Sequence, residues 1–372
     1  MTPTRHVVGI MTGTSLDGID AAMVRIEGSG LGLTAVPIHH RSVALGQATD
    51  ALKRLAADDP MPASAWARAG LDLAKACTAI ALEVSDGTQP DLVAVHGQTV
   101  HHAPPSSIQW INPAPIVQGM NCPVVHDLRA ADLAAGGQGA PITPLADWIM
   151  FRSAEPLTVI NLGGFCNVTH LPSDTSDARA IEAIQARDVC PCNHLLDAAA
   201  QKLLRQPYDQ DGEAALAGQC DESLAHKLIE SLRNHVTLDR SLGSGDEGHA
   251  ALAPLWQIER PDDALATLVA AIAQLILASV PNSQERILLA GGGARNAALV
   301  QAISSSAPTS VELTNEVGVD VQARESIAMA ILGTLAMDGV PITLPQVTGT
   351  RETTRFDGSW CFPRETFPRE YT

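Results

Sequence analysis

Residues 7–26 read VVGIMTGTSLDGIDAAMVRI, and this segment sets the architecture of the chain. An apolar run ends at Met11, a turn of glycine and hydroxyl residues follows, and a second apolar run begins at Ile19. The pattern predicts two antiparallel strands joined by a short loop. Because Gly13 and Gly18 allow backbone conformations that other residues avoid, the loop can offer N–H groups and hydroxyls to a phosphate. A hairpin loop that only reverses the chain is the alternative.

Composition places the chain among globular proteins of about two domains. It has 372 residues, of which 45% are hydrophobic and 17% charged. The formal net charge of -17 argues against nucleic acid or an anionic membrane as a partner. Seven cysteines, with no secretory signal before the first strand, predict reduced thiols and a cytoplasmic protein.

Strand-like and helix-like segments alternate along the rest of the chain, which predicts an α/β protein. An uncharged run from Ala264 to Val280 is expected to form a buried helix rather than a membrane span. The other predicted helices are 63–82, 193–204, 297–304 and 324–337, and the other predicted strands are 91–95, 122–125, 157–160, 168–171 and 286–290.

The second hairpin repeats the design of the first, with a turn Asn161-Leu162-Gly163-Gly164-Phe165-Cys166-Asn167 between apolar runs. Two halves that each open with such a hairpin suggest a duplicated α/β unit with a ligand cleft between the halves. We place the domains at residues 1–130 and 131–372. Packing of the C-terminal segment back on the first domain is left open as an alternative.

Polar residues follow two of the predicted strands. His96-Gly97-Gln98-Thr99 ends an apolar strand, where polar groups face the ligand side of an α/β sheet, and His96, Gln98 and Thr99 are candidates to contact a polyol. Arg129 is a candidate for a carboxylate or phosphate, with an ion pair inside the protein as the alternative.

The glycine-rich segment Gly291-Gly292-Gly293 comes after a predicted strand, and Asn296 stands where a dinucleotide-binding motif has its third glycine. This argues against an NAD site, and the turn either approaches an adenine or ribose or only packs the helix on the sheet. The chain has no GxxxxGK[ST] motif, so any phosphate site is of another kind.

The remaining candidates for functional residues are two acids and a CxC pair of cysteines. Asp188 precedes a predicted turn, Cys190-Pro191-Cys192, and Glu325 opens the last helix. Each acid by itself is typical of a helix cap or of a first-turn acid. The cysteines lack a second ligand pair for zinc, so we expect buried, inert thiols.

The ordered motifs resemble those of the anhydro-N-acetylmuramic acid kinases, a branch of the sugar kinase, Hsp70 and actin superfamily. The resemblance covers nearly the whole chain. It is carried by residues 9–20, His96-Gly97-Gln98-Thr99, Arg129-x-x-Asp132 running into 136–141, residues 161–167, Asp211-Gly212 with Gly218, and residues 291–296.

The resemblance implies two RNase H-like domains with an interdomain cleft, which bind ATP, Mg and a 1,6-anhydro sugar. Water attacks C1 of the sugar while O6 accepts the γ-phosphoryl group. Asp188 occupies the position of the family's base, Glu325 matches an acid near the sugar, and a homodimer is expected. The nucleotide-binding candidates are Gly13, Thr14, Ser15, Leu16, Asp17, Gly18, Ile19, Asp20, Asn161, Gly163, Gly164, Asn167, Gly291, Gly292 and Gly293, with Asp17 also the metal candidate.

The chain departs from the family around Asp188. Where the family has Phe-Asp-Thr-Gly-Pro-Gly-Asn, this chain has Arg-Asp-Val-Cys-Pro-Cys-Asn at 187–193, without the hydroxyl and both glycines. The segment Lys-Ser-Thr-Gly-Arg-Glu-Phe becomes Arg-Ser-Leu-Gly-Ser-Gly-Asp at 240–246. These changes leave two alternatives open: a kinase of another anhydro or reducing sugar, and a nucleotide-gated sugar sensor without catalysis.

Overall fold

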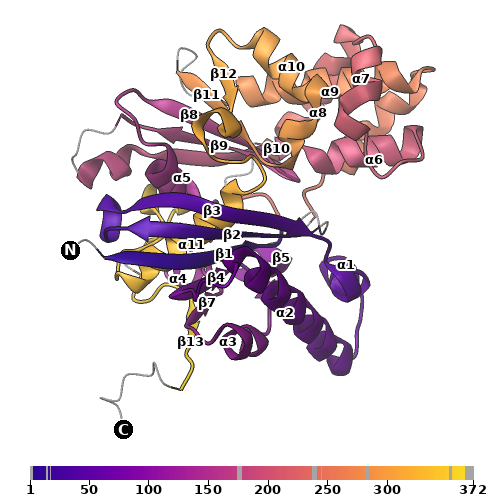
Figure 1. The fold of residues 1–372 in the computed structure, drawn as a ribbon. Coiled ribbons are helices and arrows are strands. Elements are labelled where there is room, and N and C mark those ends of the chain that lie inside the picture. The colour runs from indigo at the N-terminus through magenta and orange to yellow at the C-terminus, as the bar shows by residue number, and fades with distance from the viewer. Residues whose placement is uncertain are drawn as a thin grey trace. The chain divides into compact units, whose positions relative to one another are not determined.

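The computed structural model describes residues 3–13, 16, 18–173, 178–236, 241–243, 245–280, 285–351 and 354–364. Within this part, the chain forms two compact units. Unit 1 comprises Met1–Arg152 and Gln322–Thr372, and unit 2 comprises Ser153–Val321. In Figure 1 the yellow C-terminal elements accordingly belong with the indigo and purple N-terminal ones.

Unit 1 is built on a six-stranded sheet in the order β13-β7-β4-β1-β2-β3. The predicted N-terminal hairpin is confirmed, with β1 antiparallel to β2, and β4 runs parallel to β1. Its strands are β1 (Thr4–Met11), β2 (Ile19–Glu27), β3 (Thr34–Val43), β4 (Leu92–Val95), β7 (Val124–His126) and β13 (Ser359–Cys361), and β5 (Gln98–Ala103) and β6 (Ser106–Trp110) form a separate hairpin.

Helices cover both faces of the unit 1 sheet. Val8 and Ile10 pack with residues of α2, whereas a Cβ at Gly9 would lie 1.9 Å from the Ser326 backbone oxygen in α11. Since neighbouring residues of a strand point to opposite faces, α2 and α11 lie on opposite sides. The helices are α1 (Thr49–Ala56), α2 (Ala63–Ser85), α3 (Ala114–Met120), α4 (Ala130–Ala134), α5 (Pro144–Phe151), α11 (Arg324–Met337) and α12 (Pro345–Thr348).

Unit 2 repeats this topology with a five-stranded sheet in the order β10-β9-β8-β11-β12. The first three strands of each unit, β1 to β3 and β8 to β10, are antiparallel neighbours, and the next two run parallel to the first. The strands of unit 2 are β8 (Leu157–Leu162), β9 (Phe165–Leu171), β10 (Gln185–Pro191), β11 (Arg286–Ala290) and β12 (Val311–Leu313). The shared strand order confirms the predicted duplication and the RNase H-like fold.

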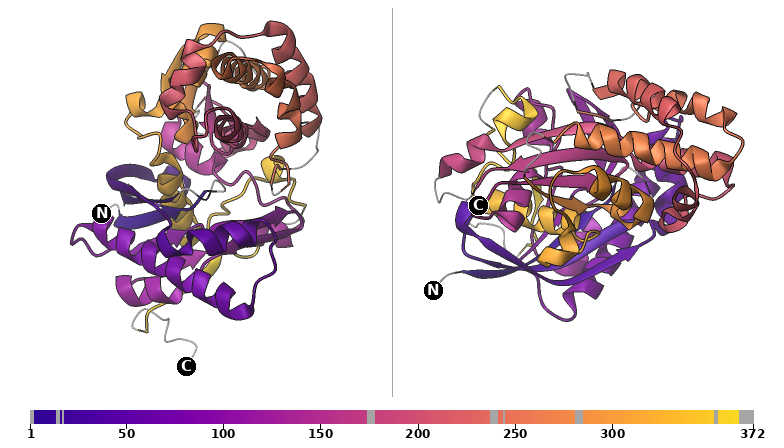
Figure 2. Two further views of the ribbon diagram at one scale, coloured as in Figure 1. Left: turned by 90° about the vertical axis from the view of Figure 1, so that its right-hand side faces the viewer. Right: turned by 90° about the horizontal axis from the view of Figure 1, so that it is seen from above.

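The core of unit 2 lies between its sheet and a layer of helices. The uncharged run at 264–280 lies mostly in α9, where it is largely buried, as predicted. No helix in the described part of the chain combines the length and apolarity needed to cross a membrane. The helices are α6 (Asn193–Leu203), α7 (Glu213–Ala217), α8 (Glu222–Val236), α9 (Pro261–Leu277) and α10 (Ala297–Ser306), and Figure 2 shows these pink to orange helices in two further views.

The division into units differs from the predicted boundary at residue 130. Helix α5 contacts β3 and α11, and Arg152 after it donates hydrogen bonds to the backbone oxygens of Leu31 and Leu33 at 2.8 and 2.9 Å. The chain therefore leaves unit 1 only after Arg152. It returns at Gln322, so that α11 and β13 complete unit 1.

Candidate active site

The loop between β1 and β2 is described at four positions, Thr12, Gly13, Leu16 and Gly18, and three predicted ligands, Thr14, Ser15 and Asp17, lie outside the described residues. The Thr12 side chain is buried, and its hydroxyl has no hydrogen-bond partner among the described residues. A Cβ at Gly18 would lie 2.8 Å from the Val43 backbone oxygen, so the loop returns close against β3. An orphaned hydroxyl beside a tight loop is suited to a polar ligand.

Gln98 and Thr99 begin β5 beside this loop. The Gln98 side chain is fully buried, and its Nε2 donates to the Gly13 backbone oxygen at 2.8 Å. The Gln98 Oε1 and the Thr99 hydroxyl have no partner within the described part of the chain. The structure therefore brings these two predicted residues together with the first loop, and both leave a buried polar atom for a ligand to satisfy.

His96 follows β4 and is held at both ring nitrogens. Its Nδ1 lies 2.7 Å from the Gly97 backbone oxygen, and its Nε2 accepts from Nε of Arg129 at 3.0 Å. Because a carbonyl oxygen can only accept, these partners assign the proton to Nδ1. Burial, and then the charge of Arg129, lower the pKa of His96 to about 3. A ligand reaching this ring through nitrogen must displace one of these bonds.

Lowering the pH is expected to destabilise the protein through His96. Its pKa falls from 6.5 to about 3 on folding, so between these values the unfolded state binds more protons. The free energy of unfolding should fall by up to about 1.4 kcal/mol for each pH unit through this window. Urea unfolding between about pH 7 and about pH 4.5 should show a steeper pH dependence in the wild type than in His96→Gln. Equal slopes would contradict the assignment.

Glu325 lies in the first turn of α11, as predicted, and is partly buried. Burial is the main cause that raises its pKa, with Arg324 acting in the opposite direction and Asp20 adding to the increase. The charge of Arg129 also lowers the pKa of Glu325. The predicted residues Asp20, Arg129 and Glu325 are thus electrostatic neighbours within unit 1. The side chain of Asp20 accepts a hydrogen bond from the Ser42 hydroxyl on β3.

In unit 2, three predicted residues form a row across neighbouring strands. Asn161 of β8 lies opposite Asn167 of β9, and Asn167 lies opposite Asp188 of β10. Residues directly opposite in a sheet share a face, so the three side chains lie side by side. Their neighbours in sequence, such as Ile160 and Cys166, belong to the hydrophobic core on the other face. The Asn167 Oδ1 is buried and has no partner among the described residues.

Asp188, the last residue of this row, lies within a strand. The strand continues through Cys190 and Pro191, where a turn was predicted. Residues 185–191 form the edge strand β10, and α6 begins only at Asn193. Pro191 is compatible with this assignment because it is the last residue of an edge strand. The pairing shifts between Asp188 and Cys190, which is a β-bulge, a feature common beside active sites. The Asp188 Oδ2 accepts from the Leu242 backbone N–H at 2.7 Å.

The glycines of unit 2 are packed closely around this row. A Cβ at Gly291, where φ is +83°, would lie 2.7 Å from the Asn161 Oδ1. A Cβ at Gly293 would lie 2.8 Å from the Asn193 Oδ1, and one at Gly164 would lie 2.5 Å from the His194 Nε2. Gly163 accepts at its backbone oxygen from the Asn193 N–H at 3.1 Å. A Cβ at Gly291 or Gly293 would also lie within 3.0 Å of the Leu162 backbone oxygen, so the close packing of the segment 291–293 on the second hairpin depends on glycine at these two positions.

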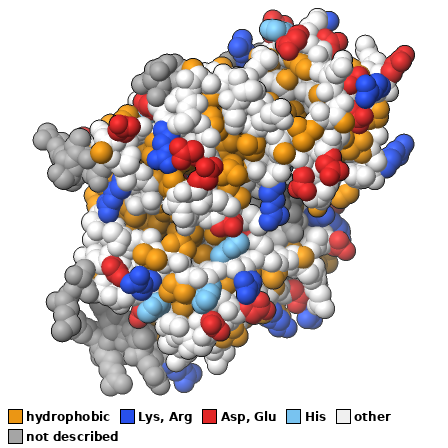
Figure 3. Space-filling model, turned by 45° about the horizontal axis from the view of Figure 1, so that its top comes forward, with side chains coloured by type: hydrophobic (Ala, Val, Ile, Leu, Met, Phe, Trp, Pro, Cys, Tyr) orange, Lys and Arg blue, Asp and Glu red, His pale blue; other side chains and the backbone are white. Residues whose placement is uncertain are grey.

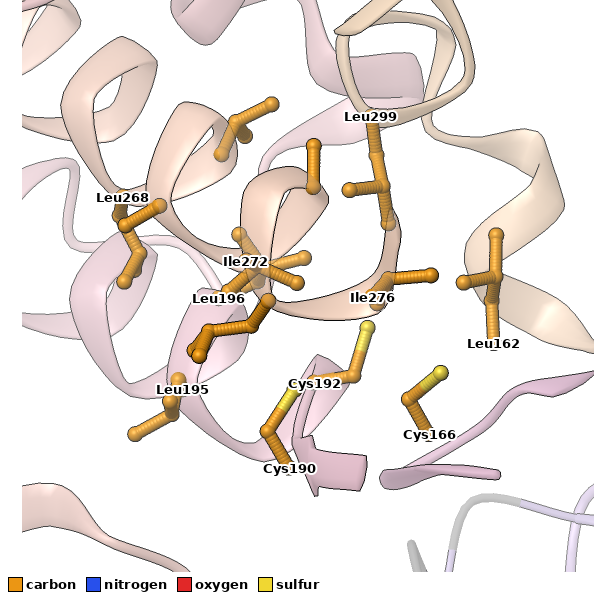
Figure 4. Close-up of a cluster of buried hydrophobic side chains, with 14 of the residues drawn as sticks. Leu162, Cys166, Cys190, Cys192, Leu195, Leu196, Leu268, Ile272, Ile276 and Leu299 are labelled. Carbon is orange, nitrogen blue, oxygen red and sulfur yellow. The ribbon is translucent and has the colours of Figure 1, made fainter. Parts of the chain in front are cut away.

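The three cysteines of unit 2 face the other way, into the core. Figure 4 shows Cys166, Cys190 and Cys192 beside Leu162 and Ile276. All three are buried, and burial raises the pKa of the Cys190 thiol to about 12. This confirms the expectation of buried thiols. They are not disulfide-bonded, and no group of three or more metal-ligating side chains occurs in the described ranges.

Three buried side chains of unit 1 have contacts that the sequence did not predict. Asp132 accepts from Gly139 and Thr348, and Asp147 pairs with Arg324. Asp132 could have been identified from the sequence, because it belongs to the Arg129-x-x-Asp132 motif. Asp147 and Arg324 are 177 positions apart, and no local pattern links them.

Comparison with known proteins gives matches over nearly the whole chain. The sequence model of a family described as anhydro-N-acetylmuramic acid kinase matches residues 5–360. The anhydro-N-acetylmuramic acid kinase of Salinibacter ruber is 35% identical, with 93% of each chain covered. That of Synechococcus elongatus is 33% identical, with 92% of this chain and 96% of its own covered.

Among solved structures, component A of the (R)-2-hydroxyglutaryl-CoA dehydratase of Acidaminococcus fermentans is similar with a TM-score of 0.47. It is 14% identical, with 89% of this chain and 98% of that chain covered.

Proposed function

Because the chain belongs to the anhydro-N-acetylmuramic acid kinase family, we propose that it converts 1,6-anhydro-N-acetylmuramic acid, water and ATP into N-acetylmuramic acid 6-phosphate and ADP. The match over residues 5–360 carries this proposal. The sugar would come from peptidoglycan recycling, and we place the reaction in the cytoplasm. Acidic and basic side chains are interspersed on the face that Figure 3 shows.

ATP is proposed to bind the glycine-rich surfaces of both hairpin loops. In unit 2, glycine at 164, 291 and 293 lets the second hairpin turn and the segment 291–293 pack closely on neighbouring residues of the same unit, and the Asn167 Oδ1 is buried without a partner among the described residues. In unit 1 the Thr12 hydroxyl has the same property. Such loops supply the positioning and charge stabilisation on which phosphoryl transfer depends.

Magnesium is proposed to bind with the phosphates rather than in a cage of side chains. Mg²⁺ usually takes one or two carboxylates together with phosphate oxygens and water. Asp17 is the proposed ligand, and Asp20, a described carboxylate on β2, is near enough in sequence to assist. The ion would neutralise charge on the transferring phosphoryl group.

Asp188 is proposed as the base that takes a proton from the attacking water. The water oxygen bonds to C1 of the sugar, the C1–O6 bond breaks, and O6 takes the γ-phosphoryl group as ADP leaves. A single carboxylate suffices for the proton transfer. Gln98, Thr99 and Arg129 are proposed to bind the sugar, and Glu325 to lie near it. The raised pKa of Glu325, caused mainly by burial, suits a carboxyl group that shares hydrogen bonds with sugar hydroxyls.

Purified protein supplied with the anhydro sugar and ATP-Mg is expected to form ADP and the 6-phosphosugar in equal amounts. In oxygen-labelled water, label should enter at C1 and not the phosphoryl group. Mass spectrometry of products quenched early would check both points. A panel of other anhydro and reducing sugars separates this substrate from the alternative acceptors. Tight binding of sugar and ATP without any turnover would instead favour the sensor.

A further inference from the structure

The C-terminal segment 345–351 is hydrogen-bonded to residues 132–139 of unit 1. The Gln138 N–H donates to the Thr348 backbone oxygen at 2.9 Å, and the Arg351 N–H donates to the Ala135 backbone oxygen at 3.2 Å. More than two hundred positions separate the segments in sequence. The segment 345–351 is therefore hydrogen-bonded to the loop that follows Arg129 and α4.

The Asp132 carboxylate is the centre of this contact. The Asp132 side chain is fully buried, and its Oδ1 accepts from the hydroxyls of Thr348, at 2.6 Å, and Thr350. Its Oδ2 accepts from the Gly139 N–H at 2.6 Å. A buried carboxylate is costly unless hydrogen bonds compensate its charge, so these donors and the acid depend on one another.

Gly137 shows how closely the loop is packed on this carboxylate. A Cβ at Gly137 would lie 2.2 Å from the Asp132 Oδ2 and 2.5 Å from the Thr350 hydroxyl. The loop therefore cannot shift toward the acid, and its backbone is fixed on that side.

The same loop holds Arg129 from its other side. The Gly139 backbone oxygen accepts from Nη1 of Arg129 at 2.9 Å, while Nε of Arg129 donates to His96 at 3.0 Å. The Gly139 N–H thus donates to Asp132, while the Gly139 carbonyl oxygen accepts from Arg129 and orients it. Two bonds to different edges fix the plane of a guanidinium group, which one bond does not.

We propose that Asp132, Thr348 and His96 are positioning residues that orient the Arg129 guanidinium, so that the C-terminal segment is part of the sugar-binding machinery. The sugar-binding part of this inference rests on the proposed function of Arg129. The orientation of Arg129 is a separate claim, which His96 reports directly because its Nε2 accepts the Arg129 bond. Neither claim requires Asp132 or Thr348 to touch a substrate.

The kinetic test compares Thr348→Val with Thr348→Ser. Valine removes the hydroxyl and keeps the shape, so kcat/KM for the anhydro sugar should fall about tenfold to hundredfold, chiefly through KM, because a bond to a buried charge is lost. The KM for ATP should stay within about twofold. Serine restores the hydroxyl and should restore activity. Thr334→Val is the matched control, because Thr334 is also fully buried and its hydroxyl bonds only within α11, among described residues.

The second readout is the His96 ring, followed by nitrogen NMR with His96→Gln to assign its signals. The wild type should show only the Nδ1–H tautomer, and Thr348→Val should raise the pKa of His96 by about one unit as the Arg129 charge moves away. If Thr348→Val does not fold, Thr350→Val tests the same carboxylate. Signals and kcat/KM equal to those of Thr334→Val would overturn the proposal. If the wild type has no kinase activity, the proposed function fails while the NMR comparison still decides whether Arg129 is oriented this way.

Discussion

Replacing Asp188 with asparagine is expected to reduce kcat by about 10²–10⁴-fold and to leave ATP affinity unchanged. The amide keeps the shape of the side chain and still accepts the Leu242 hydrogen bond, seen at 2.7 Å, through its oxygen. It does not take a proton from water at neutral pH. The loss should therefore fall on the chemical step, and stopped assays of ADP release at saturating sugar and ATP would measure it.

The matched control for Asp188→Asn is Glu230→Gln, which removes an exposed carboxylate from α8 in the same unit. We expect this variant to keep wild-type kcat. Calorimetric titration with a non-hydrolysable ATP analogue should give the same affinity for both variants and the wild type. Full turnover by Asp188→Asn would exclude this carboxylate as the base, and loss of ATP binding would move its role to the nucleotide.

Replacing Asp147 with asparagine is expected to lower the free energy of unfolding by about 3–5 kcal/mol. Asp147 and Arg324 are both fully buried, and Nε of Arg324 donates to the Asp147 Oδ1 at 2.8 Å. Thr143 accepts a further bond from Arg324 at 3.0 Å. Burial raises the pKa of Asp147, and Arg324 is the main group that opposes the increase. Without the carboxylate, the guanidinium charge stays buried and uncompensated.

A double-mutant cycle separates the pair from its surroundings. Adding Arg324→Met to Asp147→Asn should recover part of the lost stability, because the buried charge is gone. Glu27→Gln is the control: Glu27 forms an ion pair with Arg25, but both side chains are more than 40% exposed, so its effect should stay below about 1 kcal/mol. Urea unfolding at neutral pH would check the series. A double variant less stable than Asp147→Asn alone would argue against an unpaired charge as the cause.

Much of the secondary structure was predictable because its signals are local. The strand Arg286–Ala290 and the helix Arg324–Met337 have the predicted bounds, since each is an apolar run between clear polar or glycine boundaries. The predicted turn Cys190-Pro191-Cys192 was wrong, because Cys190 and Pro191 belong to strand β10. Its Cys-Pro-Cys sequence indicates a loop locally, but pairing of β10 with β9 extends it as a strand.

The candidate site was predictable in part. The sequence identified Asn161, Asn167 and Asp188 separately, and strand register aligned them in one row. It also singled out His96 as a ligand-facing residue. That its ring is engaged at both nitrogens depends on Arg129 and Gly97, which local sequence does not specify.

The duplicated hairpins, the alternation of strand-like and helix-like segments and the family could be established from the residues alone, because hydrophobic periodicity and glycine-rich turns are properties of contiguous sequence. The partners of the buried charges could not be established from the residues alone. Asp147 with Arg324, and Asp132 with Thr348, join segments 177 and 216 positions apart. Which buried charge meets which donor depends on how elements pack, and only the folded chain brings Asp132, Gly139, Arg129 and His96 into one hydrogen-bonded chain.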